Sequence, residues 1–272
     1  MMDMDANPKL KAILNSKARE ARVTRQLLLS QVILMKISPG ILEKLTNLRH
    51  LYIVGCSLTG SVPHQLVNMS NLQTLDLSDN KLNVVPSPIF ENLRQLRTVD
   101  LSRNDFVAFP KSLKYLQKLK KLNLSFNKFL EMPAELGYLK HLQHLDMSSN
   151  LIDSISTDAI CQAWKNSLIV LKLANNLISR LPSQIGLLTA LQELDIRNNR
   201  LRYLPAMAAL LLNISIFRYS GNEWRVYSPH SSYSLYGQHL EEDDVQADAA
   251  SYGPAALEKL LSYCINSNAD EI

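Results

Sequence analysis

Leucines alternate with polar residues in one short segment of the chain, LQTLDLSDNKL, which runs from Leu72 to Leu82. Leucine fills its first, fourth, sixth and last positions, and Asn80 fills the ninth. The alternation of Leu75 and Leu77 with polar neighbours predicts a short strand with one buried face. Because one such strand cannot fold alone, the pattern predicts further copies.

The same frame recurs along most of the chain. Clear copies begin at Leu96, Leu119, Leu142, Leu168 and Leu191, and looser copies at Leu48 and Ile214. The ninth position holds, in order, Cys56, Asn80, Asn104, Asn127, Asn150, Asn176, Asn199 and Asn222. The intervals between them are 24, 24, 23, 23, 26, 23 and 23 residues. A degenerate copy precedes them, with Leu27 and Leu29 as its strand leucines and Val32 in place of asparagine. A period of this length predicts stacked structural repeats.

This frame resembles the leucine-rich repeat family, over residues 24–227. The spacer LPSQIGLLTAL, from Leu181 to Leu191, is similar to that of the short intracellular, Ras-suppressor-like members, whereas LTGSVPHQL at Leu58 is closer to the plant-type spacer. The resemblance implies an α/β solenoid, namely a leucine-rich repeat horseshoe with a parallel β-sheet on its concave face and helical caps at both ends.

The domain organisation follows from the limits of the repeats. Residues 1–23 are expected to form an N-terminal capping helix that starts at Asn7 and Pro8, with Leu10, Ile13 and Leu14 on its covering face. About nine repeats fill residues 24–227, the first and last of them degenerate. Residues 228–272 are expected to hold an acidic loop and a C-terminal capping helix in which Leu257, Leu260 and Leu261 face the last coil.

Polar and bulky residues inside the repeats are predicted to be structural. The asparagines turn inward where the chain leaves each strand, and their amides can bond the backbone of the bend and of the next coil. The extra residues of the 26-residue interval fall on the convex side. There Ser156 or Thr157 could cap a short helix that turns Ile160 and Trp164 into the core.

Composition favours a cytoplasmic protein without a cofactor. Three cysteines are scattered, without the disulfide-rich caps of extracellular family members. The apolar run Leu27–Met35 is too short to cross a membrane, and the acidic N-terminus lacks the features of a signal sequence. With only eight glycines, no glycine-rich phosphate loop is available.

Charge is distributed unevenly. Residues 228–272 hold eight of the 25 acidic and one of the 29 basic residues, which gives −7 there and +11 over residues 1–227. A basic solenoid beside an acidic loop suggests an acidic partner or a loop that shields the basic face. Two independent solvated surfaces are an equal alternative.

Catalytic and metal-binding patterns are weak. Asp76 and Asp100 would be neighbours in one column of the concave face, but aspartate is common at this position in leucine-rich repeats. His141 and His144 are three residues apart on a strand, so their rings point to different sides. The sequence therefore predicts neither an enzyme nor a metal site.

A recognition site is predicted from the column that precedes the asparagines. Phe126 is the only aromatic residue in this column, which is otherwise polar or small. Cations and one histidine surround it in the predicted repeats: Arg103, Lys121, Lys128 and His144. An exposed aromatic among cations is typical of an interface anchor, whereas packing of Phe126 against a neighbouring loop is the structural alternative.

Further partner-binding candidates lie on the same face. Tyr52 begins the column that contains Asp76, and a basic cluster in the last repeats comprises Arg197, Arg200 and Arg218. The run from Lys111 to Lys121 adds positive charge along the outer turn, so contact with a nucleic acid is an alternative hypothesis.

These features together predict a non-enzymatic adaptor or scaffold that binds a protein on its concave face. The family resemblance implies a signalling partner such as a small GTPase or a phosphatase. The alternative is a structural component or assembly factor of a large, RNA-containing complex, docked through the basic surface.

Overall fold

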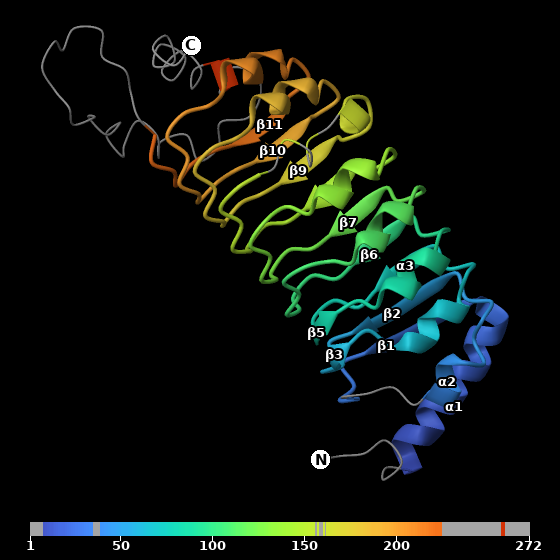
Figure 1. The fold of residues 1–272 in the computed structure, drawn as a ribbon. Helices are drawn as coiled ribbons and strands as arrows, with labels where there is room; N and C mark the ends of the chain where they lie inside the picture. The colour runs from blue at the N-terminus through green and yellow to red at the C-terminus, as the bar shows by residue number, and fades with distance from the viewer. Residues whose placement is uncertain are drawn as a thin grey trace, which may run out of the picture. The chain divides into compact units, whose positions relative to one another are not determined.

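The computed structural model describes residues 8–34, 39–155, 157, 160, 162–224 and 257–258. The chain divides into two compact units. The first contains residues 1–129 and 138–142, and the second contains residues 130–137 and 143–272. Each unit is a solenoid of coils in which a short strand, a bend and a helical turn repeat (Figure 1).

The first unit is built on five parallel strands. In spatial order they are β1 (Gln26–Ser30), β2 (His50–Val54), β4 (Thr74–Asp76), β6 (Thr98–Asp100) and β7 (Lys121–Asn123). A separate two-stranded sheet pairs β3 (Thr59–Ser61) with β5 (Lys81–Val84). The helical segments are α1 (Pro8–Thr24), α2 (Pro39–Leu42), η2 (His64–Asn68), α3 (Ser87–Asn92) and η3 (Lys111–Tyr115).

The second unit repeats the arrangement with four parallel strands. These are β8 (His144–Asp146), β9 (Val170–Lys172), β10 (Glu193–Asp195) and β11 (Ile216–Arg218). Its 3-10 turns are η5 (Gln162–Trp164), η6 (Ser183–Leu187) and η7 (Ala206–Leu210), and η4 (Ala134–Tyr138) lies where the units divide.

Strand register places equal positions of successive repeats side by side. Leu51 pairs with Leu27 on one side and with Leu75 on the other, and all three side chains are buried. The alternate residues of each strand face away from this core and form a partly exposed surface, which we call the strand face. Burying each leucine stabilises the stack by roughly 1.5–3 kcal/mol, but only while a neighbouring coil covers it.

The asparagines are structural, as predicted. The Asn80 amide donates to the carbonyls of Ile53 at 2.8 Å and Leu77 at 2.9 Å. Its oxygen accepts from the backbone N–H groups of Cys56 at 3.1 Å and Leu58 at 3.0 Å. One side chain therefore joins two consecutive coils. The equivalent amides of Asn104, Asn127, Asn176, Asn199 and Asn222 bond in the same way.

Cys56 takes the place of an asparagine in the first full repeat. Its side chain is buried, and its thiol donates weakly to the Leu29 carbonyl, with the two heavy atoms 3.6 Å apart. Burial raises the pKa of the thiol above its ordinary value, although a backbone hydrogen bond from Val32 opposes the rise. The thiol is therefore protonated and unreactive at neutral pH.

Aromatic and other bulky residues also fill the core. Ile160 and Trp164 are buried, which confirms their predicted inward direction, and Trp224 is buried in the last aliphatic position of its copy. Half-buried Phe109 contacts three buried phenylalanines of the first unit, with ring centroids 5.1 to 6.0 Å away: Phe90, Phe106 and Phe129.

One predicted face of the N-terminal helix is wrong. α1 packs on β1 and buries Leu14, but Ile13 is 52% exposed. Ala21 lies seven residues after Leu14, two helical turns on, and is buried in its place. The side chain of Leu10 lies outside the described part of the chain. So do the acidic segment of residues 240–248, Ser156, Leu260 and Leu261, whereas Leu257 is described and buried.

Candidate functional site

The residue before each asparagine adopts a left-handed backbone conformation. Phe126 has φ of 55° and Arg103 has φ of 54°. The bend is held by neighbouring coils, since the Arg103 N–H donates to the Ser125 carbonyl at 2.9 Å. At the same place other repeats carry residue types that tolerate the conformation better, namely Gly55, Asp79, Asn175, Asn198 and Gly221.

Phe126 is exposed at the edge of the strand face in the first unit. Its side chain is 48% exposed, and the Arg103 guanidinium carbon lies 4.3 Å from the ring centroid. Such a cation–π contact at an exposed site contributes about 0.5–1 kcal/mol. The pair forms one flat surface that is apolar on the ring and positive at its margin.

Three other predicted residues of the first unit lie on nearby strands and bends. Lys121 begins β7 and is exposed, and within the described residues no carboxylate pairs with it. Lys128 pairs with Asp105 at 2.6 Å, so its charge is partly compensated. Tyr52 lies on β2 directly opposite Asp76 of β4.

The second unit contains the other predicted residues. His144 begins β8, and Arg200 is exposed in the segment that follows β10. Arg197 and Arg218 are not free cations, because both contact carboxylates of β10. Arg197 pairs with Asp195 at 2.7 Å, and Arg218 contacts Glu193.

The β10 carboxylates neutralise most of this predicted basic cluster. Glu193 also lies 3.5 Å from Lys172, and the Asp195 side chain is only 5% exposed. Three cations thus surround two carboxylates: Lys172, Arg197 and Arg218. This surface is a cross-strand ion-pair network rather than the strongly positive patch that residue counting suggests.

The aspartates on the strand face of the first unit are held by their own bends. Asp76 accepts from the backbone N–H and hydroxyl of Ser78 at 2.9 and 2.6 Å, and Asp100 bonds Ser102 with the same distances. Burial raises the pKa of Asp76, the bonds from Ser78 lower it, and the charge of Asp100 raises it further. Asp100 also accepts from the Asn123 amide at 2.9 Å.

Asp76 and Asp100 thus have a structural role in the bends that follow their strands. In the described ranges no three histidine, cysteine, aspartate or glutamate side chains form a group that could hold a metal ion. The strand face offers charge, hydrogen bonds and one exposed aromatic ring, which are the means of molecular recognition.

Comparison with known proteins agrees with the repeating coils. A family model described as a leucine-rich repeat region matches residues 11–168, more than half of the chain. The chain belongs to the leucine-rich repeat family. Among solved structures, a leucine-rich repeat protein of Leptospira interrogans has a TM-score of 0.69 at 25% identity, covering 79% of this chain and 59% of that one.

Two further proteins are similar to parts of the present chain. The plant peptide hormone receptor RGFR1 in complex with RGF2 gives a TM-score of 0.60 at 25% identity, over 73% of this chain and 31% of the receptor. The volume-regulated anion channel subunit LRRC8D of Rattus norvegicus is 34% identical over 77 residues, 28% of this chain and 9% of the subunit. The chain thus spans less than a tenth of this channel subunit. No helix in the described part of the chain is long and apolar enough to cross a membrane.

The ion-pair network of the second unit was missed in the sequence, although a signal for it existed. The parallel register places Lys172, Asp195 and Arg218 in one row across three strands, so alternating charges predict pairing. The Arg103 to Phe126 contact follows the same rule, because both residues occupy one position of adjacent repeats. Glu193 was missed because its own row neighbours, Val170 and Ile216, carry no charge.

Proposed function

We propose that this leucine-rich repeat protein is a non-enzymatic adaptor or scaffold of intracellular signalling, located in the cytoplasm, which binds a protein partner through its strand face. The pair formed by Phe126 and Arg103 is the proposed anchor. A small GTPase, a phosphatase or another signalling protein is the proposed class of partner.

The exposed ring of Phe126 is the observation that carries this proposal. A left-handed backbone costs a residue with a large side chain about 1–2 kcal/mol, and 48% exposure means that the core gains little from the ring in return. Strain that the fold does not need is a recognised sign of a functional position. Aromatic and arginine side chains are also the residues that dominate binding energy at interfaces.

Neighbouring charges fit a partner with an acidic rim around an apolar pocket. Lys121 presents a cation at the start of β7, the strand that precedes Phe126. Tyr52 adds a second aromatic side chain on the same face of the first unit. In the second unit Arg200 is exposed and is the proposed further contact, with His144. Arg197 and Arg218 stay in the proposed surface, but their β10 partners reduce what they can offer to phosphate.

The RNA-docked alternative is weaker for the same reason. Phosphate binding relies on uncompensated positive charge, and two of the predicted arginines are compensated. The exposed lysines of the η3 region remain as its main support.

The test compares two cation–aromatic pairs of the same chemistry. Arg103→Ala with Phe126→Ala removes the proposed anchor. The matched control, Arg94→Ala with Tyr115→Ala, removes a pair on the helical side of the coils, where the Arg94 guanidinium carbon lies 5.3 Å from the Tyr115 ring centroid. Tagged full-length chains capture proteins from cytosol, with and without nuclease, and the dissociation constant of the leading partner is then measured with purified components.

Truncating the anchor is expected to cost about 2 kcal/mol, or roughly 30-fold in affinity, while the control stays near wild type. Equal affinity of the anchor variant and wild type would contradict the proposal, as would an equal loss in both variants. Partners that disappear on nuclease treatment would favour the RNA-docked alternative.

A further inference from the structure

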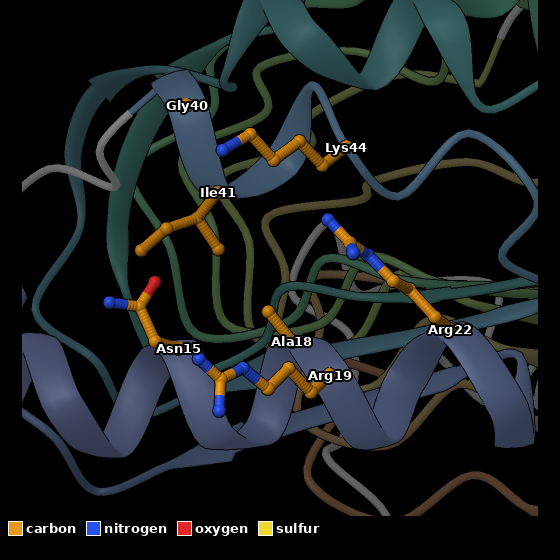
Figure 2. Close-up of a pocket in the computed structure, with 7 residues that line it drawn as sticks. All are labelled: Asn15, Ala18, Arg19, Arg22, Gly40, Ile41 and Lys44. Atoms are coloured by element: carbon orange, nitrogen blue, oxygen red, sulfur yellow. The ribbon is translucent and has the colours of Figure 1, made fainter.

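A cleft in the N-terminal cap has the character of a ligand site. It encloses about 330 Å³ between α1 and the segment that contains α2. Its lining comprises Asn15, Ala18, Arg19, Arg22, Gly40, Ile41 and Lys44. Figure 2 shows the α1 side chains on one side of the gap and Gly40, Ile41 and Lys44 on the other, with the Lys44 side chain lying along its own segment and Arg22 extending toward it from α1.

Helical spacing explains how α1 builds one wall. Residues 15, 18, 19 and 22 recur at intervals of three and four, so they share one face of the helix. Ala18 leaves room in the middle of this wall, and a Cβ atom added to Gly40 opposite would meet nothing within 4 Å. The small residues therefore keep a space open between longer polar side chains.

The charge of the cleft is one-sided. Arg19, Arg22 and Lys44 are cations, and none of the described residues that line the cleft is a carboxylate. Over the described ranges none of the three has an ion-pair partner. A helix dipole favours a cation in the last turn, which accounts for Arg22, but it explains neither Arg19 nor Lys44.

We infer that this cleft binds a compact phosphorylated ligand. Two guanidinium groups donate bidentate hydrogen bonds to phosphate oxygens, Lys44 adds a point charge, and the Asn15 amide can bond a hydroxyl or phosphate oxygen. Ile41 gives the ligand body an apolar contact. A lipid headgroup and a free phosphorylated metabolite share this chemistry.

The site is separate from the proposed protein-binding surface. It lies in the cap and shares no residue with the Phe126 anchor, so each proposal can fail without the other. A protein with both sites would bind a partner on its strand face and a phosphorylated molecule at its N-terminal end.

Calorimetric titration of the full chain tests the inference with two soluble probes, inositol trisphosphate and inorganic pyrophosphate. We expect saturable binding of at least one probe. Arg19→Gln with Arg22→Gln should weaken it about tenfold or more, since hydrogen bonds to charged groups are lost. Ala18→Leu, which keeps all three cations but fills the cleft, should abolish binding.

The control is Lys17→Gln with Arg25→Gln, which removes the same charge from the N-terminal cap at two residues that do not line the cleft. It should stay within about twofold of wild type, because diffuse attraction of an anion depends on net charge rather than on one face. Thermal unfolding of each variant shows whether the cap is intact.

Vesicles distinguish the two sources of the ligand. Phosphatidylcholine vesicles with a few per cent of phosphatidylinositol bisphosphate should retain the protein if the source is a lipid. Binding of soluble probes without retention on these vesicles indicates a free metabolite. Absence of saturable binding to both soluble probes and vesicles would overturn the inference, and so would equal losses in the control and in the double arginine variant. Binding to single-stranded RNA in preference to both probes would overturn it as well.

Discussion

Replacing Phe126 with asparagine separates what the ring costs the fold from what it contributes to binding. The backbone there has φ of 55°, which costs a large side chain about 1–2 kcal/mol and asparagine less. Two later repeats already carry asparagine at this place, and the Asn198 amide donates to the Asn175 oxygen at 2.8 Å. The replacement is therefore compatible with the bend.

Two terms decide the sign of the change in stability. Relief of backbone strain contributes about 1 kcal/mol or more. Loss of the exposed contact with Arg103 costs about 0.5–1 kcal/mol. The asparagine variant should thus equal wild type or exceed it by up to about 1 kcal/mol. Phe126→Ala keeps most of the strain and loses the contact, so it should be less stable than wild type by about 0.5–1 kcal/mol.

Urea unfolding of the three proteins measures the order directly. We expect asparagine to be at least as stable as wild type and alanine to be the least stable, with similar denaturant slopes. Both variants should lose partner affinity alike. A loss of stability above about 1 kcal/mol in the asparagine variant would refute the reasoning, because it would mean that the ring is needed for packing.

Three further changes test other parts of the account. Asp76→Asn should raise stability at neutral pH. Burial, and then the charge of Asp100, raise the pKa of this carboxyl above 3.8 in the folded chain. The folded chain therefore holds the proton more tightly than the unfolded chain does, and the wild type loses stability as pH rises through the raised pKa. The gain should fade below pH 3.8, where the carboxyl is protonated in both states, and a gain that persists unchanged in acid urea titrations would contradict this. Ser112→Ala should be neutral or stabilise by about 1 kcal/mol in urea unfolding, because the buried hydroxyl has no hydrogen-bond partner in the described part of the chain. Gly186→Ala should lower the melting temperature, at a cost of about 1–3 kcal/mol, because its Cβ would overlap the backbone carbonyl of Met207 in the next turn. An unchanged melting temperature would show that η6 and η7 can separate freely.

The repeat could be predicted from the sequence because each frame position has one physical task. Leu27 and Leu29 were assigned to a strand although their copy lacks the asparagine, and both are buried in β1. Position alone sufficed, since a residue in a stacked coil meets the same residue of its neighbours. Trp224 fills the last position of its copy, where other copies carry an aliphatic residue, and it is buried there as well.

Features that depend on side-chain direction were beyond this rule. Ile13 was placed on the covering face of α1, but that residue is exposed to solvent and Ala21 is buried instead. The cleft beside Arg19 could not be foreseen either. It depends on the distance between α1 and the segment with Gly40 and Lys44, and no repeat specifies that distance.

The regular bend before each asparagine limits where recognition can arise. In the described coils this position lies outside the core, and residues of very different size occupy it. Glycine, aspartate and asparagine satisfy the backbone at most of these places, whereas Phe126 puts a large ring at one of them, which is the basis of the proposed anchor. The arginine one repeat earlier sharpens this argument. Arg103 occupies the same conformation, and its guanidinium carbon lies 4.3 Å from the centroid of the Phe126 ring. In the proposed complex this contact would reduce the entropy that the ring loses on binding. A partner that uses Phe126 as its anchor, as proposed, would meet a ring that already contacts Arg103.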